Sequence, residues 1–305
     1  MVLILSLKND FTTNLVIDWL CFYEKKHIRI NDSFAGVAFK SQKKYLKIKD
    51  GLLLDFEHIS SFWFRKGSTF LSTAENKILE DENKINLDYA QYLLEQKHSI
   101  GNTGGAIKIN KLIALNIAKD CGLNIPNSFL IDSKDELENL LMSNIEKKYI
   151  IKAKTNISMY QFDDSSGMIF TNEVTKDDLE KFPENFGSTL VQELIEKKFE
   201  IRSFFLKNKI WSMAIFSQND TQTQHDYRRY NNDKPNRNTL FQLPSDIEVK
   251  LRLVMEKLNL DTGSIDWIYA EDDQFYFLEV NPIGQFTNVS FICNYNLEKE
   301  VAKLL

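Results

Sequence analysis

Two acidic side chains near the end of the chain raise the first question of chemistry. They lie in the stretch IDWIYAEDDQFYFLEVN (265–281), which reads as two short strands around the polar turn EDDQ. If Ala270 faces Phe275 across this turn, Asp266 lies directly opposite Glu279. Like charges that face each other destabilise an antiparallel pair of strands, so this pairing needs a neutralising cation.

Asn281 adds a third oxygen to this pair of acids. Residues two apart share one face of a strand, so Asn281 points the same way as Glu279. Carboxylate and amide oxygens suit a hard divalent cation, Mg²⁺ or Mn²⁺, which commonly bridges to substrate phosphates. The alternative is a solvated edge hairpin whose acids repel each other weakly in water.

Three lysines upstream could meet such phosphates. Lys152 and Lys154 in IIKAKT share one strand face within an otherwise apolar strand, where an unpaired ammonium group is costly to bury. Lys111 stands in the first turn of a predicted helix, and helix N-termini attract anions. The alternative for the strand lysines is a sheet edge from which their ammonium groups reach water.

The segment LVQELI (190–195) suits a hinge whose backbone N–H and C=O groups read the edge of an adenine base. The hinge residues are Gln192, Glu193, Leu194 and Ile195. In FEIRSF, Glu200 and Arg202 share one strand face. An acid that holds ribose hydroxyls or metal, beside a cation that stabilises a transferring phosphoryl group, is sensible nucleotide chemistry; a cross-strand salt bridge is the plainer alternative.

The elements that must position these residues follow from the hydrophobic pattern. Short apolar runs and helical spacing in the first hundred residues predict a small α/β domain. A helix capped by Asn110 and stopped at Gly122 follows, then strands and a helix in which Ser133 and Glu136 have capping-box spacing. From Thr189 onward the alternation predicts antiparallel strands, interrupted by a polar loop over 217–240.

Composition excludes several classes of protein. The 305 residues carry 38 basic and 43 acidic side chains, a net charge of −5, which argues against general nucleic-acid binding. No apolar run approaches the length of a membrane span, and no signal-type segment opens the chain. Three widely spaced cysteines and four isolated histidines fit neither disulfides nor a zinc site, so a cytoplasmic protein is expected.

The order of these features is more specific than any one of them. The order helix NKLIALNIAKDCGLNIP, lysine strand IIKAK, and VQELI with E-x-R resembles the ATP-grasp superfamily over about residues 100 to 300. An aspartate separated by twelve residues from E-x-N completes the resemblance. The N-terminal segments ILSLKNDFTTNLVIDWL, HIRIND, FWFRKG and HSIGNTGG, with IFTNEV, resemble the graspetide synthetases within it, as in microviridin and grasp-with-spasm systems. The expected fold is α/β and α+β in three subdomains: 1–100 pre-ATP-grasp, 101–188 central with the small sheet, and 189–305 C-terminal with the metal hairpin.

The resemblance implies an ATP-dependent peptide maturase. A carboxylate of a ribosomal precursor peptide attacks the γ-phosphate of ATP, and a Ser or Thr hydroxyl or a Lys amine then displaces phosphate from the acyl phosphate. By the same resemblance Lys111 and Lys152 hold phosphates, the hinge 192–195 holds adenine, and Glu200 holds ribose. The enzyme is expected to bind the leader and core of its precursor as a homodimer, without nucleic acid or membrane.

The remaining roles also come from the resemblance. Asp266, Glu279 and Asn281 hold one or two Mg²⁺ ions, and Arg202 lies near the reacting phosphate. Asp226 and Arg228 in HDYR match a family element near the acceptor peptide. The sequence departs from the family in a phosphate-covering loop with one glycine and in NPIGQF, which replaces Asn-Pro-Asn-Gly.

Two other functions stay open at this point. One is an ATP-grasp ligase that joins a small carboxylate or a protein tail to an amine, and the other is a nucleotide-binding module that docks peptide without catalysis. Two metal carboxylates that are costly without metal argue against the second. The sequence leaves open the precursor peptide, ester or amide product, the rings formed and the leader-binding residues.

Overall fold

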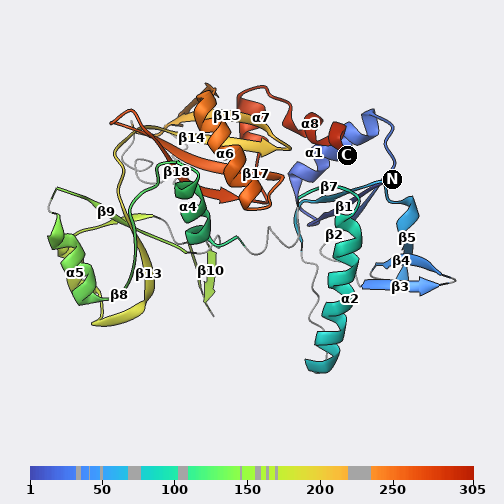
Figure 1. The fold of residues 1–305 in the computed structure, drawn as a ribbon, viewed down its shortest axis with the longest axis horizontal. Helices are drawn as coiled ribbons and strands as arrows, with labels where there is room; N and C mark the ends of the chain where they lie inside the picture. Colours follow the sequence, from blue (N-terminus) through green and yellow to red (C-terminus); the bar gives the residue numbers. More distant parts are fainter. Residues whose placement is uncertain are drawn as a thin grey trace.

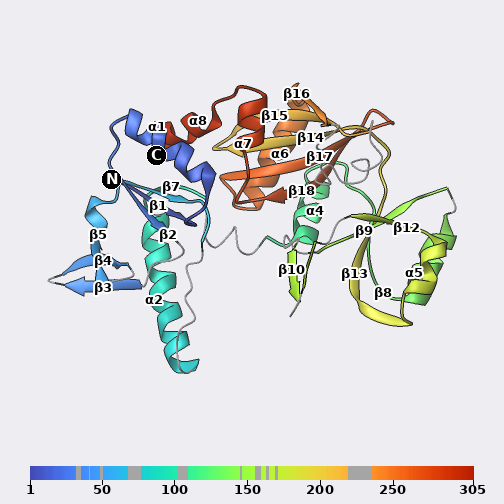
Figure 2. The ribbon, with the colours of Figure 1, turned by 180° about the vertical axis from the view of Figure 1, so that it is seen from behind.

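The computed structural model describes most of the chain. The described residues are 1–31, 36–40, 42–48, 51–67, 77–101, 109–144, 146–154, 159–162, 165–168, 171–218 and 235–305, with backbone alone at 77, 79, 80, 159–162 and 165–168. Among the five sheets of the described residues, the three largest lie side by side, each with its own helices (Figure 1). The large sheet stands between the N-terminal sheet and a small sheet at the far end (Figure 2).

A four-stranded parallel sheet opens the chain, in the order β2-β1-β6-β7. The inner strand β1 has the sequence VLILS, four apolar residues and a serine, and every residue is buried, as expected for a strand covered on both faces. The elements are β1 (Val2–Ser6), α1 (Phe11–Phe22), β2 (His27–Asn31), β6 (Ser61–Phe64), α2 (Lys77–Glu95) and β7 (His98–Ile100). An antiparallel set follows β2: β3 (Gly36–Lys40), β4 (Lys43–Lys47) and β5 (Leu53–Asp55), then the short helix η2 (Phe56–His58).

The small sheet has the order β12-β9-β13-β8 and is antiparallel throughout. Ser133 caps α5 by accepting a hydrogen bond from the Glu136 N–H, as its spacing predicts. The elements are β8 (Ser128–Ser133), α5 (Lys134–Ser143), β9 (Tyr149–Lys152), the hairpin β10 (Met159–Phe162) and β11 (Ser165–Met168), β12 (Asn172–Val174), η3 (Lys176–Lys181) and β13 (Asn185–Glu193).

The large sheet is also antiparallel, in the order β16-β15-β14-β17-β18. Buried residues of α4 and α6, including Leu115 and Leu251, pack with Trp267 and Phe277 on one of its faces. The elements are α4 (Lys111–Asp120), β14 (Lys197–Leu206), β15 (Lys209–Phe216), β16 (Arg237–Phe241), α6 (Ser245–Lys257), β17 (Thr262–Ala270), β18 (Phe275–Asn281), α7 (Thr287–Ile292) and α8 (Leu297–Leu304).

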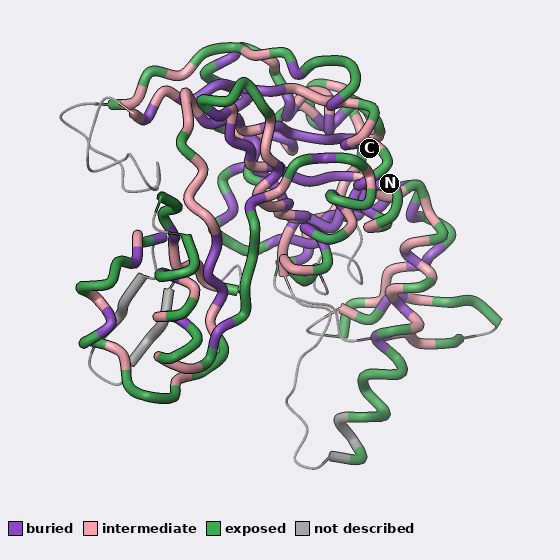
Figure 3. Tube along the Cα trace, turned by 60° about the vertical axis from the view of Figure 1, so that its left-hand side comes forward, coloured by how far each residue is buried: buried purple, intermediate pink, exposed green. Residues whose placement is uncertain are grey.

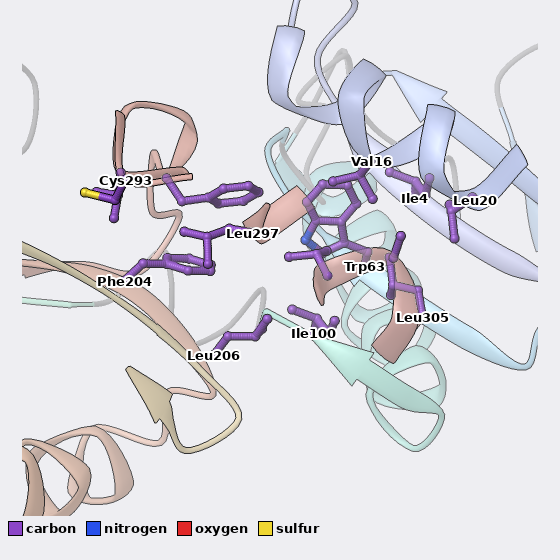
Figure 4. Close-up of a cluster of buried hydrophobic side chains, with 14 of the residues drawn as sticks. Ile4, Val16, Leu20, Trp63, Ile100, Phe204, Leu206, Cys293, Leu297 and Leu305 are labelled. Atoms are coloured by element: carbon purple, nitrogen blue, oxygen red, sulfur yellow. The ribbon is translucent and has the colours of Figure 1, made fainter. Parts of the chain in front are cut away.

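One hydrophobic cluster joins the two ends of the chain. Ile4 and Trp63 of the N-terminal sheet pack with Phe204, Leu297 and other residues of the C-terminal part (Figure 4). Buried segments accordingly gather in these two parts, whereas much of α2 is exposed (Figure 3). The N-terminal sheet and the large sheet therefore form one body.

Two contacts cross the predicted boundaries between the three subdomains. The boundary between 188 and 189 falls inside β13, which pairs with β8 and β9 of the small sheet. Helix α4, within the predicted central domain, packs on the large sheet instead. The three-part division remains a prediction, and these contacts show where its elements pack.

Candidate active site

The acidic hairpin forms as β17 and β18, with a register that the sequence does not show. Asp266 does lie opposite Glu279. The predicted pairing of Ala270 with Phe275 is wrong, because Phe275 faces Tyr269. A β-bulge between these pairs inserts one extra residue, Leu278, and so restores the predicted opposition of the two acids.

The bulge follows from which residues of β18 must be buried. Phe277 and Val280 both belong to the core under the sheet although they are three residues apart, a spacing that would put them on opposite faces of a regular strand. They pair with Trp267 and Ile265, which are two residues apart. The extra residue reconciles the two spacings, and it leaves Glu279 on the face that carries Asp266.

Cations of the chain itself lie beside both acids. Arg202 of β14 is directly opposite Asp266, and its Nη1 is 3.3 Å from the Asp266 Oδ1. The Lys111 Nζ is 2.6 Å from the Glu279 Oε2. The sheet thus presents a row of Arg202, Asp266 and Glu279, and Lys111 reaches Glu279 from α4. The two acids are neighbours in this row, and each has a cation beside it.

Helix α4 fixes Lys111 at this row. The predicted cap, Asn110, accepts hydrogen bonds from the backbone N–H groups of Leu112 and Ile113, so the helix begins at Lys111 itself. The Lys111 Nζ also donates to the Ala153 carbonyl, at 3.2 Å, just beyond the end of β9. A single ammonium group therefore links α4, the large sheet and the small sheet.

Asn281 ends β18 with its side chain held by the turn that follows. Its Oδ1 accepts hydrogen bonds from the N–H groups of Ile283 and Gly284, at 3.1 and 3.4 Å. Gly284 has a φ of +54°, and a Cβ there would lie 3.1 Å from the Ser264 backbone nitrogen. A side chain at this position would therefore disturb the turn that orients Asn281.

A pocket of about 320 Å³ opens between the small and large sheets. Its apolar walls are Ile150, Leu194, Ile195 and Ile268, and its polar rim includes Lys148, Glu196, Lys197, Gln218 and Glu271. Ile268 lies on β17 two residues from Asp266, so the pocket adjoins the charged row on one face of the sheet. Apolar walls with a few polar groups at the rim are typical of a site for a flat organic ring.

Only two of the four predicted hinge residues line this pocket. Leu194 and Ile195 line it, and the Leu194 N–H donates to the Lys148 carbonyl, at 2.8 Å. The Ile195 N–H has no hydrogen-bond partner among the described residues. Gln192 lies opposite Ile150 and so on the face of the small sheet that borders the pocket, although its amide donates to Ser128. Glu193 pairs with Lys147.

Glu200 is almost fully buried beside the pocket and does not line it. Lys197, which does line it, forms an ion pair with Glu200, and the Ser217 hydroxyl donates to the same carboxylate oxygen at 3.1 Å. Burial raises the pKa of Glu200, and the attraction of Lys197 and Ser217 opposes that rise. Glu200 therefore acts on the pocket only indirectly, by holding the Lys197 side chain that lines it.

Lys152 ends β9 opposite Leu190 and is half-buried. It is two residues from Ile150, so both point to one face of the small sheet, the face on which Ile150 lines the pocket. Asp226 and Arg228 lie outside the described residues. Lys197, Ile150 and Ile268 were missed from the sequence, because neither a lysine at a strand start nor an isoleucine within a strand differs from ordinary packing residues.

Comparison with solved structures gives the fold a name. Macrocyclase MdnC of Microcystis aeruginosa MRC, solved with its precursor peptide MdnA, matches with a TM-score of 0.77 and 23% identity over 100% of this chain and 99% of that chain. A RiPP-associated ATP-grasp ligase of Chryseobacterium gregarium, solved with ADP and a leader and core peptide, matches with a TM-score of 0.79 and 21% identity over 99% and 94%. The chain has the ATP-grasp fold.

A third solved structure agrees. PsnB, solved with a minimal precursor, Mg and ADP, matches with a TM-score of 0.71 and 12% identity over 99% of this chain and 96% of that chain. No protein-family model matches the sequence, and no curated protein sequence matches it. The evidence for the ATP-grasp fold of this chain is therefore its tertiary structure. The order of its sequence motifs predicts the same fold.

The donor atoms of the ATP-grasp hairpin fit a divalent cation that is shared with a ligand. Within the described ranges no three His, Cys, Asp or Glu side chains gather at one place. Two carboxylates and one amide leave an octahedral ion several open positions, which suits Mg²⁺ because it keeps water and phosphate oxygens in its shell.

Proposed function

We propose that the protein is an ATP-dependent peptide ligase that closes rings in a ribosomal precursor peptide. It joins Asp or Glu side-chain carboxylates to Ser or Thr hydroxyls or Lys amines. The observation that carries this proposal is the row of Arg202, Asp266 and Glu279 beside the pocket at Leu194 and Ile195. The full-length likeness to ligases solved with precursor peptides supports the choice of a peptide.

The pocket between the sheets is the proposed adenine site. Ile150 and Ile268 would cover the two faces of the ring, and the Ile195 N–H, with the carbonyls of the hinge, would read its edge. Glu200 would orient Lys197 toward the ribose end of the nucleotide. Lys111 and Lys152 would hold the phosphates.

The charged row is the proposed metal and phosphate site. Asp266, Glu279 and Asn281 would hold one or two Mg²⁺ ions, with Mn²⁺ as a substitute, and Arg202 would stabilise negative charge on the reacting phosphate. ATP supplies the phosphate that makes the peptide carboxylate reactive. Asp226 and Arg228 remain proposed neighbours of the acceptor peptide.

The experiment is a reconstitution with the peptide encoded beside the gene. Incubation of the protein, ATP and Mg²⁺ with that peptide should remove one water mass per crosslink and release one ADP per water lost. ADP release that requires an added small carboxylate or protein tail together with an amine, without mass loss in the peptide, would instead favour ligation of that carboxylate or tail. No ADP release with any acceptor would contradict a ligase.

The setting of the enzyme is also proposed. We expect a homodimer in the cytoplasm, where ATP and Mg²⁺ are available and the free cysteines Cys21, Cys121 and Cys293 stay reduced. In the part of the chain that the structure describes, no helix is both long enough and apolar enough to span a bilayer. Sedimentation analysis at micromolar concentration tests the dimer.

A further inference from the structure

An arginine of the N-terminal sheet reaches the turn that holds Asn281. Arg65 follows β6 directly and is 2% exposed. Its Nη1 donates to the main-chain carbonyls of Ile283 and Gly284, the latter at 2.6 Å. In sequence the contact spans more than two hundred residues, from the motif FWFRKG to NPIGQF.

The same peptide group is held from both sides. The carbonyl of Ile283 and the N–H of Gly284 belong to one planar peptide unit, in which they point in opposite directions. Arg65 binds the carbonyl, and the N–H donates to Asn281, to its backbone carbonyl at 3.1 Å and to its Oδ1 at 3.4 Å. Since the unit is rigid, a rotation that lost the arginine would also turn the N–H away from Asn281.

Arg65 is itself fixed by a buried carboxylate. The Asp10 Oδ2 lies 3.2 Å from the Arg65 Nε and also accepts from the Thr13 N–H and hydroxyl, while the Asp10 Oδ1 lies 2.7 Å from the Lys66 Nζ. Burial alone would raise the pKa of Asp10, but Arg65, Lys66 and Thr13 together hold it at about 2. Asp10 therefore stays charged and the guanidinium keeps one orientation.

Stability alone does not explain a buried arginine here. The Arg65 Nη2 has no hydrogen-bond partner among the described residues, and leaving a buried donor unsatisfied costs about 1–3 kcal/mol. The guanidinium carbon lies 5.7 Å from the ring centre of Phe286, a member of the hydrophobic cluster around Trp63. Residues that break local packing rules in this way concentrate at functional sites.

We propose that Arg65 is a positioning residue for the metal site. Held by Asp10, it fixes the peptide unit between Ile283 and Gly284 and thereby the direction in which Asn281 presents its amide. The proposal rests on the function proposed above, because Asn281 is there a ligand of Mg²⁺ in the nucleotide complex. The N-terminal sheet then sets the affinity of a site on the large sheet.

The test measures ADP binding to the full chain as MgCl₂ is titrated, by calorimetry, with thermal melts in parallel. Arg65→Lys keeps the charge but cannot span Asp10 and two carbonyls. The Mg²⁺ concentration for half-maximal ADP binding should rise roughly 10- to 100-fold, as for other residues that orient metal ligands. ADP binding in EDTA should be unchanged.

Two further variants keep the test decisive if Arg65→Lys folds poorly. Asp10→Asn/Arg65→Met removes both buried charges together, which proteins generally tolerate, and it should show the same rise in the Mg²⁺ requirement. Arg29→Lys is the matched control: Arg29 also donates to main-chain carbonyls of the N-terminal sheet region, at Leu7 and Lys8, but has no described contact with residues 281–284. Its Mg²⁺ requirement should match that of the wild type.

The outcomes separate this proposal from the proposed function. A wild-type protein that binds no Mg²⁺ and ADP contradicts both. A wild type that binds them, with Arg65 variants of lower melting temperature and unchanged Mg²⁺ requirement, overturns the positioning role alone. A raised Mg²⁺ requirement in both Arg65 variants, with Arg29→Lys unchanged, supports it.

Discussion

At the scale of the residue, the site is a set of paired charges. Asp266 faces Arg202, and Glu279 faces Lys111, within a few ångströms on a half-buried sheet face. Each acid therefore has a cation partner before any ligand is considered. The opposition of two like charges, which a strand pair tolerates badly, is stable here because each acid has an opposite charge beside it.

Glu279→Gln tests the metal assignment. The variant removes the negative charge of a proposed metal ligand, which is also the ion-pair partner of Lys111. Peptide-dependent ADP release should therefore fall by roughly 10²-fold or more. Glu300→Gln is the matched control, since Glu300 pairs with Lys209 and Lys303 on the surface. Unchanged turnover in Glu279→Gln, with the fold checked by circular dichroism, would contradict the assignment.

Asp10 gives a pH dependence of stability. Its pKa is about 2, below its ordinary value of 3.8, so ionised Asp10 stabilises the fold by about 2 kcal/mol. A lowered pKa in the folded state contributes stability above about pH 4, and this contribution is lost as the pH falls through about 2. The difference in unfolding free energy between wild type and Asp10→Asn should therefore narrow from pH 5 to pH 2, as measured in urea; parallel curves would contradict this.

At the scale of the element, the bulge in β18 decides how the hairpin serves two faces. It buries both Phe277 and Val280 while Glu279 stays on the face of Asp266. Bulges commonly re-aim a side chain next to an active site. In the sequence, the bulge is indicated by two buried residues, Phe277 and Val280, that are three positions apart.

Deletion of Leu278 tests whether the bulge matters for the orientation of Glu279 as well as for core packing. A regular strand would keep Phe277 with Trp267 and Val280 with Ile265, so the protein should still fold. Glu279 would stay opposite Asp266, but the bend and the added twist that a bulge gives a strand would be lost, so we expect the Mg²⁺ needed for ADP binding to rise roughly tenfold. One glycine inserted after Asp272, in the exposed turn, is the control; equal Mg²⁺ requirements in both variants would show that the bulge does not aim the acid.

At the scale of the whole molecule, one hydrophobic core joins two sheets and another is confined to a single sheet. The cluster around Trp63 joins the N-terminal sheet to β14, α7 and α8. The cluster around Leu137 stays within the small sheet and its helices. The pocket lies between the small sheet and the larger body, so its walls belong to units that can open separately.

Hydrogen exchange should reveal these two units. Trp63→Ala should cost about 3–5 kcal/mol and lower protection in the N-terminal and large sheets together. Leu137→Ala should lower protection mainly in residues 128–193, because its contacts are confined there. Equal loss of protection across the chain in Leu137→Ala would show that all three sheets unfold as one.

The sequence by itself determined what depends on neighbouring residues. Side-chain caps at Asn110 and Ser133 form as their spacing predicts, since a cap needs only the next helical turn. The shared face of Glu279 and Asn281 follows from the period of a strand. The ordered motifs of the superfamily also led to the fold that the comparisons show.

Only the tertiary structure decided what joins distant segments. Lys111 meets Glu279, Arg65 meets the turn after Asn281, and the pocket takes its walls from two sheets. Helix α4 packs on the large sheet although it precedes the small sheet in the chain. Such contacts depend on how whole elements bury their apolar faces against one another, which local propensity and spacing do not encode.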